Sequence, residues 1–342
     1  MSASTPENQV WKLVKKPQGD LKDDDFKLES IPVPTITDGQ ILVRALWISV
    51  DPYLRGRVGN HPLNTPVVSG LVGEVIESKS SNYKVGDNVR FYGAWQRVQA
   101  VTVETAEKTQ ELQKAVVPDG TRLSVALGVL GMPGATAYLG LKHAGSFKKG
   151  DAVVITGAAG AVGASVGQYA RAWGASKVVG FAGGPEKCKL VKEKFGFDEC
   201  IDYKKFNTAQ AVKDELKRIQ PDGFDVFFEN TGGHVSDAIY DGNLRKFARV
   251  ALCGNIANYN NSEESKIRNP FLDCIYTSVR IQGFLWADFR DDLPSFQKEA
   301  LAMVKDGKLK FEETVVEGFE STVKAFQGLF KGHNTGKMVV KV

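Results

Sequence analysis

The chain has 342 residues, of which 42% are hydrophobic and 25% charged, so it contains enough apolar material for one or two folded domains. This composition excludes a disordered chain and a small disulfide-stabilised scaffold. The net charge of +4 is far from the concentrated basic surface of a nucleic-acid-binding protein, so we expect no nucleic-acid partner.

Residues 1–120 contain short apolar segments between turn signals, which predict a mostly β first domain. The predicted strands are Ile41–Val50, Leu71–Ile76, Asn88–Phe91 and Val98–Val103. A helix-containing junction is predicted at Ser124–Ala144.

From Asp151 onward the pattern changes to alternating strands and helices. The predicted strands are Ala152–Thr156, Lys177–Phe181, Glu199–Asp202, Asp225–Glu229, Arg249–Cys253 and Ile281–Phe284, and the predicted helices are Ala161–Trp173, Pro185–Phe195, Ala209–Ile219 and Val235–Leu244. Repeated β-α units imply a parallel sheet with helices on both faces, the doubly wound α/β class. The tail is predicted to return to the first domain through Ser295–Lys305, Val315–Phe319, Ser321–Phe330 and Lys337–Lys341.

The strongest local motif follows the strand Ala152–Thr156. Glycine or alanine occupies positions 158, 160 and 163, which is the G-x-G-x-x-G spacing with alanine in the first place. The strand before the motif and the helix after it are the context of a dinucleotide-binding fingerprint. Gly160 lets the backbone approach a pyrophosphate, and Gly163 lets the helix pack closely against the sheet. A tight turn would also favour glycine, but the β-α-β context favours cofactor binding.

The residues after the second strand favour NADP over NAD. An acid about 20 residues beyond the fingerprint would bind the ribose hydroxyls of NAD, whereas here the segment 180–184 is small and apolar and Lys187 follows. A lysine can pair with the 2′-phosphate of NADP. Glu186 opposes this interpretation, and an ordinary surface lysine is the alternative for Lys187.

Taken together, these motifs resemble the zinc-independent medium-chain reductases. Within them they are most similar to the prostaglandin reductase, leukotriene hydroxydehydrogenase and plant 2-alkenal (double-bond) reductase group. The resembling stretches are 47–57, 131–138, 157–163, 229–233, 253–259 and 331–341, in family order along nearly the whole chain. The resemblance implies a GroES-like mostly-β domain of residues 1–126 completed by 299–342, a Rossmann NADP-binding domain of residues 127–298, and a homodimer.

The resemblance also implies the residues of the site. Ala158, Ala159, Gly160, Ala161, Val162 and Gly163 would hold the pyrophosphate, and Lys187 and Tyr203 would face the 2′-phosphate. The rest of the cofactor site would comprise Asn230, Cys253, Tyr259, Phe284, Leu285, Trp286 and Asn334. Tyr259 and Tyr276 match two tyrosines near the nicotinamide, and Tyr53 and Trp286 are implied at the substrate pocket.

Two stretches depart from the family pattern. A proline-rich segment of the family is replaced here by residues 260–265, and Phe284–Trp286 is bulkier than usual, which would narrow an acyl-chain tunnel.

Zinc-dependent relatives need a cysteine in the first domain and a Gly-His-Glu motif, but here no cysteine precedes position 188 and the matching stretch 70–74 has no histidine. We therefore expect no metal. Oxidation of an ordinary alcohol, which depends on a Lewis acid, consequently loses support as the function. We expect instead that hydride passes from NADPH to the β-carbon of an α,β-unsaturated aldehyde or ketone of the 2-alkenal, alkenone or oxo-eicosanoid type. Tyr259 would stabilise the enolate, and solvent or a tyrosine would protonate the α-carbon.

Alternatives remain open at the level of sequence. Tyr259 could only anchor the ribose, Tyr276 could be a core residue, and Tyr53 could serve turn packing. An NADPH:quinone reductase would use the same cofactor site, and a non-catalytic NADPH-binding protein is the rival from another class.

The four cysteines form no C-x-x-C pair, so the spacing suggests neither a zinc knuckle nor a redox pair. We expect them to be reduced thiols of a cytoplasmic protein. The N-terminal segment lacks the apolar core of a signal peptide, and the two uncharged runs, 123–141 and 152–170, contain too many glycines for a membrane span.

Overall fold

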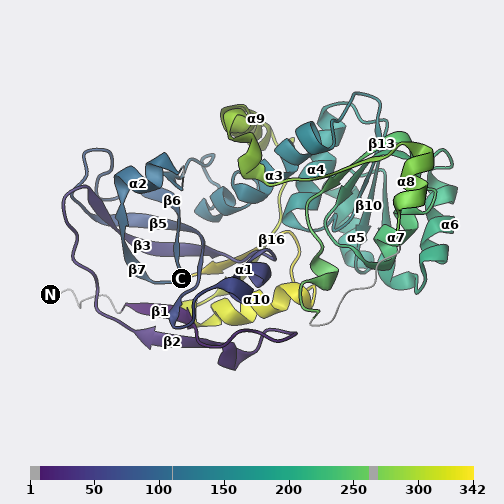
Figure 1. Cartoon of the computed structure of the whole chain (residues 1–342). Coiled ribbons are helices and arrows are strands. Elements are labelled where there is room, and N and C mark those ends of the chain that lie inside the picture. Colours follow the sequence, from purple (N-terminus) through teal and green to yellow (C-terminus); the bar gives the residue numbers. More distant parts are fainter. Residues whose placement is uncertain (1–7, 110, 262–268) are drawn as a thin grey trace. The chain divides into compact units, whose positions relative to one another are not determined.

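The computed structural model describes residues 8–109, 111–261 and 269–342, and the chain forms two compact units (Figure 1). Unit 1 consists of residues 1–127, 313–333 and 338–342, and unit 2 of residues 128–312 and 334–337. Residues 299–312, which we expected in the first domain, lie in unit 2, where Glu299 accepts hydrogen bonds from Tyr138 (3.0 Å) and Trp173 (2.8 Å). The division into functional domains remains a prediction.

Unit 2 is built on a parallel sheet that has six strands among the described residues, in the order β11-β10-β9-β12-β13-β14. Its strands are β9 (Ala152–Ile155), β10 (Lys177–Ala182), β11 (Glu199–Asp202), β12 (Phe224–Glu229), β13 (Leu244–Leu252) and β14 (Arg280–Gly283). Relative to the chain this is the order 3-2-1-4-5-6 of the Rossmann fold, so the predicted doubly wound class is confirmed. The strand order reverses between β9 and β12, the place where such sheets bind ligands.

Helices cover both faces of this sheet (Figure 1). The helical elements of unit 2 are α3 (Met132–Leu139), the π-helical turn η3 (Gly140–Ala144), α4 (Ala161–Ala172), α5 (Pro185–Glu193), η4 (Tyr203–Lys205), α6 (Ala209–Ile219), α7 (Gly233–Tyr240), η5 (Ile256–Asn258), α8 (Phe271–Thr277), η6 (Trp286–Asp292) and α9 (Leu293–Lys305). On α4, Val166, Tyr169 and Ala170 are fully buried. All four residues of β9 are fully buried, which explains why this strand has no polar position.

The region after α7 differs from the prediction. The helix ends at Tyr240 and β13 already begins at Leu244, whereas we expected a helix to Leu244 and a strand from Arg249. The early start arises because Leu244 pairs with Phe224, after which the register shifts and Phe247 adopts a φ of 65°. Such an irregular strand has no regular alternation for a sequence pattern to detect.

Unit 1 is mostly β. Its strands are β1 (Gln9–Leu13), β2 (Phe26–Ser30), β3 (Gln40–Ser49), β4 (Thr65–Pro66), β5 (Val68–Ser78), β6 (Asn88–Ala94), β7 (Val98–Thr102), β8 (Leu112–Lys114), β15 (Glu313–Glu317) and β16 (Lys337–Lys341). The remaining elements are η1 (Asp23–Asp25), α1 (Leu54–Asn60), α2 (Val103–Lys108), η2 (Leu123–Leu127), η7 (Phe319–Ser321) and α10 (Thr322–Phe330). The last strand, β16, pairs antiparallel with β3, with Val340 opposite Ile48.

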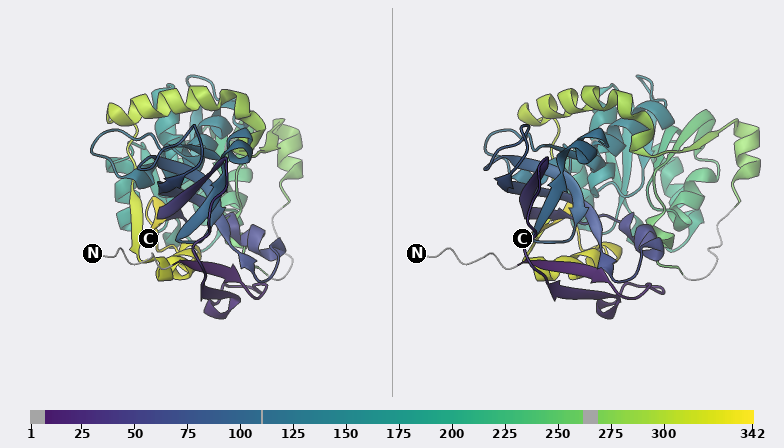
Figure 2. Two further views of the ribbon diagram at one scale, coloured as in Figure 1. Left: turned by 90° about the vertical axis from the view of Figure 1, so that its left-hand side faces the viewer. Right: turned by 60° about the vertical axis from the view of Figure 1, so that its left-hand side comes forward.

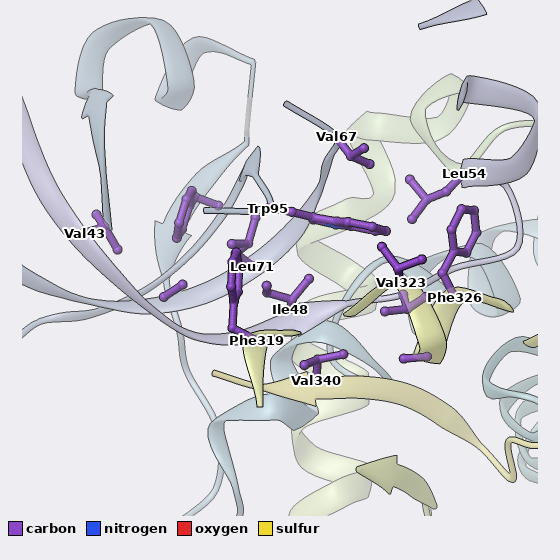
Figure 3. Packing of buried hydrophobic residues seen from close by; sticks show 14 of the residues in the cluster. Val43, Ile48, Leu54, Val67, Leu71, Trp95, Phe319, Val323, Phe326 and Val340 are labelled. Carbon is purple, nitrogen blue, oxygen red and sulfur yellow. The ribbon is translucent and has the colours of Figure 1, made fainter. Parts of the chain in front are cut away.

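The core of unit 1 joins the two ends of the chain. Trp95 is fully buried, and its ring lies edge-on to Phe326 with the centroids 5.8 Å apart (Figure 3). The indole N–H of Trp11 on β1 donates to the carbonyl of Phe319 (3.1 Å), and α10 lies beside the β1–β2 hairpin in every view (Figures 1 and 2). The C-terminal segment is therefore part of the unit 1 core.

Candidate functional site

The first candidate site lies at the carboxyl ends of the central strands of unit 2. The chain leaves β9 at Ile155, passes through the loop 156–160 and enters α4 after Gly160. The amide of Ala158 donates to the carbonyl of Phe181 on β10 (2.9 Å), so the loop is held against the neighbouring strand. The first amides of a helix have no intrahelical acceptor, and this helix start therefore offers N–H donors and positive potential to an anion.

Gly163 has no room for a side chain. A Cβ at this position would lie 2.3 Å from the carbonyl oxygen of Gly157 and 2.9 Å from the Cα of Ala158. This close approach of the helix to the loop is the property that the fingerprint requires of its last glycine. The backbone of Ala158, Ala159, Gly160, Ala161, Val162 and Gly163 thus forms one continuous segment, and these are the residues that could hold a pyrophosphate.

Asp202 shapes the turn that follows β10. Its Oδ1 accepts hydrogen bonds from the amides of Gly184 (2.8 Å) and Lys204 (3.1 Å). Because these two amides belong to different segments, Asp202 connects the β10–α5 turn to the segment after β11.

Polar and cationic side chains gather at the same turn. The hydroxyl of Tyr203 lies 2.7 Å, and the Cε of Lys204 3.2 Å, from the position that a Cβ on Gly183 would take. Lys187 lies in the first turn of α5, and burial together with the charge of Lys204 lowers its pKa. Lysines and a hydroxyl are suitable partners for a 2′-phosphate. The family resemblance implied Tyr203 at this turn but not its neighbour Lys204.

A buried carboxylate organises the point where the strand order reverses. Glu229, at the end of β12, is 2% exposed, and its Oε1 accepts hydrogen bonds from the Thr156 hydroxyl (2.7 Å) and from the amides of Thr231 (2.6 Å) and Gly232 (3.0 Å). The side-chain amide of Asn230 donates to the carbonyl of Thr156 (2.7 Å). These bonds hold the loops after β9 and β12 together, so Asn230 lies beside the pyrophosphate loop.

Tyr259 lies at the same edge of the sheet. Its hydroxyl accepts a hydrogen bond from the amide of Asn255 (3.2 Å) and lies 3.2 Å from the position of a Cβ on Gly254. The amide of Cys253 donates to the carbonyl of Glu229 (2.9 Å), and burial raises the pKa of the Cys253 thiol to about 12. Cys253 is therefore an uncharged group at neutral pH, suited to line a pocket rather than to act as a nucleophile.

The segment 334–337 belongs to unit 2 although it is close to the C-terminus. The amide of Gly336 donates to the carbonyl of Ala159 (2.7 Å), and Gly336 forms a parallel bridge with Gly160. The side-chain amide of Asn334 donates to the carbonyl of Gly336 (3.0 Å). Asn334 is thus placed next to the nucleotide loop.

The other predicted residues of unit 2 are less closely associated with this edge. Phe284 is buried, and its ring packs edge-on against Phe228 with the centroids 6.0 Å apart. Leu285 is 68% exposed, and Trp286 is partly buried at the start of η6. Tyr276 on α8 is 80% exposed, so the structure does not bury it in a pocket of unit 2. Residues 262–265 of the segment that departs from the family pattern lie outside the described residues.

A second cluster lies in unit 1 around Tyr53, the residue before α1. The Arg57 guanidinium lies 5.3 Å from the ring centroids of both Tyr53 and Tyr92, and it donates to the Tyr92 hydroxyl (2.5 Å). Burial, and then the nearby Asp51 carboxylate, raise the pKa of Tyr53 well above its usual range. Asp51 is itself buried and accepts a hydrogen bond from the Ser49 hydroxyl.

A hollow of about 350 Å³ opens beside this cluster, lined by Leu54, Gly56, Arg57, Val58, Asn60, His61, Pro62, Val67 and Val68. Sequence reasoning identified Tyr53 but missed Arg57 and Tyr92. The spacing of four residues between Tyr53 and Arg57 at a helix start was an available signal, whereas Tyr92 comes from a distant strand.

In residues 8–109, 111–261 and 269–342 we find no group of three or more His, Cys, Asp or Glu side chains that could hold a metal ion. No helix in the described part of the chain is long and apolar enough to cross a membrane.

Comparisons with known proteins agree with this architecture. Residues 9–110 match the family model described as the N-terminal domain of oxidoreductase, and residues 161–305 match the model described as zinc-binding dehydrogenase. The chain is 41% identical to the putative NADP-dependent oxidoreductase YfmJ of Bacillus subtilis (strain 168), covering 99% of this chain and 98% of that protein. It is 37% identical to the NADP(+)-dependent 2-alkenal reductase of Nicotiana tabacum, covering 94% and 93%.

The crystal structure of CurA from Vibrio vulnificus in complex with NADPH superposes with a TM-score of 0.87 at 34% identity, covering 98% of this chain and 99% of that chain. The chain belongs to the zinc-independent medium-chain reductase family, in the group of the prostaglandin and 2-alkenal reductases. The resemblance indicated by the sequence motifs is therefore confirmed, and so is the combination of a Rossmann unit with a mostly-β unit.

Proposed function

We propose that this protein is an NADPH-dependent reductase that transfers hydride to the β-carbon of α,β-unsaturated aldehydes or ketones. The observation that carries this proposal is the position of the Tyr259 hydroxyl, beside Gly254 and Asn255 at the edge of the sheet where the nucleotide loop lies. An O–H donor at this edge would stabilise negative charge on a substrate oxygen.

NADPH is the cofactor, and it supplies the hydride when bound. The backbone segment from Ala158 to Gly163 would hold its pyrophosphate, since the start of α4 presents unpaired amides there. Lys187, Tyr203 and Lys204 would hold its 2′-phosphate, because they lie around the turn after β10. Of the carboxylates here, Asp202 is bound by backbone amides and Glu186 is exposed in the first turn of α5.

The chain's own contribution to the reaction is electrostatic. Tyr259 accepts a hydrogen bond from Asn255, so its own proton is available to donate to the substrate carbonyl as that oxygen becomes an enolate. Solvent would then deliver a proton to the α-carbon. Tyr276, which is 80% exposed on α8, is assigned no step here.

We keep Tyr53 as the substrate-pocket residue that the family resemblance implies, and within unit 1 its ring lies against Arg57. Burial raises its pKa well above the usual range, so its hydroxyl remains an O–H donor throughout any practical assay pH. The adjacent Arg57 would favour substrates with an acceptor or a negative charge at this end. Trp286 would form part of the apolar wall.

The test is NADPH consumption with 2-alkenals and alkenones of graded chain length, with NADH as the cofactor control and a quinone as the rival substrate. We expect turnover of the enones with NADPH and an optimum at one chain length. Turnover of the quinone alone would establish the alternative, an NADPH:quinone reductase. If NADPH is consumed neither with the enones nor with the quinone, the protein would be a non-catalytic NADPH-binding protein.

We also propose that the protein is a homodimer. Six large apolar side chains of unit 2 are exposed on or near α8 and β14: Phe271, Leu272, Ile275, Tyr276, Ile281 and Leu285. Exposed apolar surface of this kind is typical of an interface between subunits. The cytoplasmic location remains a prediction from the sequence.

A further inference from the structure

Two cysteines that are 12 positions apart in the sequence meet in unit 2. Cys188 lies on α5 and Cys200 on β11, and both are reduced. The thiol of Cys200 donates a hydrogen bond to the sulfur of Cys188, with the two Sγ atoms 2.7 Å apart. Little movement of the backbone is therefore needed to join them, since the S–S bond of a disulfide is about 2.05 Å long.

The environment gives the two sulfurs different roles. The hydrogen bond from Cys200 lowers the pKa of Cys188, and the same interaction, together with burial, raises the pKa of Cys200. Cys188 is thus the better thiolate, and Cys200 is a thiol held in contact with it. A thiolate next to a second thiol is the arrangement in which a first oxidation product is converted to a disulfide.

The pair lies directly beside the candidate 2′-phosphate site. Cys188 follows Lys187 in the first turn of α5, and Cys200 precedes Asp202 by two residues on β11. Asp202 in turn accepts the amides of Gly184 and Lys204. A bond between the two sulfurs would therefore connect the elements that carry the cationic groups.

We propose that Cys188 and Cys200 are a redox site that peroxide converts to an intramolecular disulfide, and that this bond weakens NADPH binding. The Cys188 thiolate attacks one oxygen of hydrogen peroxide, the O–O bond breaks, and a sulfenic acid forms as water leaves. The Cys200 sulfur then attacks the Cys188 sulfur, the S–O bond breaks, and the hydroxide departs as a second water with the Cys200 proton. Two thiols and one peroxide thus become one disulfide and two waters.

The effect on NADPH follows from the position of Lys187. The bond would fix the first turn of α5 to β11, so Lys187, the residue next to Cys188, would lose the freedom to adjust its position to the phosphate. A cation that pairs with a phosphate depends on its placement, so the restrained lysine binds it less well. This step rests on the proposed assignment of Lys187 to the 2′-phosphate.

The experiment uses the full chain treated with a small excess of hydrogen peroxide and then freed of it. We expect two of the four thiols to be lost, a cross-linked Cys188–Cys200 peptide in the mass spectrum, and a several-fold rise in the KM for NADPH at unchanged kcat. Dithiothreitol should restore the initial KM. The variant Cys200→Ser should not form the disulfide, whereas the control Cys274→Ser should behave like the unmodified chain.

Loss of thiols without the Cys188–Cys200 peptide, or formation of this disulfide with an unchanged KM for NADPH, would overturn the proposal. The variant Lys187→Ala separates this failure from failure of the proposed cofactor site. If Lys187→Ala leaves the KM for NADPH unchanged, the site assignment is wrong irrespective of whether the disulfide forms.

Discussion

A few hydroxyls and cations at one edge of the unit 2 sheet carry the proposed chemistry. Tyr259 provides the donor, and Lys187 and Lys204 provide positive charge at the turn after β10. Each of these side chains can be replaced by a specific substitution that leaves the backbone in place. Their roles can therefore be separated by kinetics.

Tyr259→Phe removes the hydroxyl and keeps the ring. We expect kcat with an enone to fall about 100-fold, because loss of one donor to a developing oxyanion typically costs that much. The measurement is steady-state NADPH consumption, with Tyr240→Phe as the control, since Tyr240 packs against Phe227 in the core of unit 2. Full turnover by Tyr259→Phe would leave the tyrosine only a role in anchoring the ribose.

Lys187→Ala tests the 2′-phosphate site. A hydrogen bond to a charged group contributes about 1.5–3 kcal/mol, which corresponds to a rise of about 10- to 150-fold in the KM for NADPH. The KM for NADH, which lacks the 2′-phosphate, should stay constant. Lys189→Ala, an exposed lysine of the same helix, is the matched control. An equal rise for both cofactors would contradict the assignment.

The lowered pKa of Lys187 also predicts a pH dependence. Burial and Lys204 disfavour its charged form, so the free enzyme loses this charge at a lower pH than an ordinary lysine with a pKa of 10.5. Since the charge is needed to bind phosphate, kcat/KM for NADPH should fall as pH rises on the alkaline side. In Lys187→Arg the guanidinium stays protonated, and this decline should disappear or move to higher pH. A decline identical in both proteins would exclude Lys187 as its origin.

At the scale of elements, the junction of β9 and α4 depends on close packing at Gly163 in addition to the side-chain bonds at Thr156. The absence of a Cβ at Gly163 lets the first turn of α4 contact the loop at Gly157 and Ala158. The same loop is bound by Phe181 from β10 and by Gly336 from the C-terminal segment. Its geometry is thus determined by several elements together.

Gly163→Ala should distort this junction. The added methyl group would lie 2.3 Å from a backbone oxygen, and overpacking of this kind costs about 1–3 kcal/mol. We expect a lower Tm and a higher KM for both NADPH and NADH, because the shared pyrophosphate loop moves. Gly59→Ala, where a Cβ would meet nothing within 4 Å, should leave both unchanged. Wild-type KM values for Gly163→Ala would show that the helix can shift without affecting the cofactor.

At the scale of the whole molecule, the sheet of unit 2 ends in β14, whose Ile281 is 37% exposed. α8 adds Phe271 and Ile275, which are 65% and 69% exposed. An edge strand with apolar neighbours is a template for association. We therefore expect a second copy of the chain to cover this surface.

Ile275→Glu should convert the dimer to a monomer, because a charge buried in an apolar interface is unfavourable. Light scattering after size-exclusion chromatography measures the mass. The control is Val85→Glu in unit 1, which also introduces a glutamate at an exposed apolar side chain and should remain dimeric. A wild-type protein that is monomeric at all accessible concentrations would exclude the dimer.

Much of the fold could be predicted because local patterns define single elements. The strands β9 to β12 and the helices α4, α5 and α6 follow their predicted ranges closely, since apolar periodicity and turn residues act over a few positions. The irregular start of β13 was not predicted, because it depends on the pairing of Leu244 with Phe224. The short helix α8 was not predicted either, because its exposed apolar side chains do not form the regular pattern of an amphipathic helix.

The sequence by itself determined the class of sheet and the family and predicted the nucleotide loop, because each motif behind them consists of residues that are close together along the chain. The tertiary structure decided which side chains meet. It placed Lys204 and Tyr203 at Gly183, brought Cys188 to Cys200, and paired Arg57 with Tyr92. These contacts join residues of different helices, strands and turns, and the way such elements come together depends on the packing of the whole unit rather than on any local pattern.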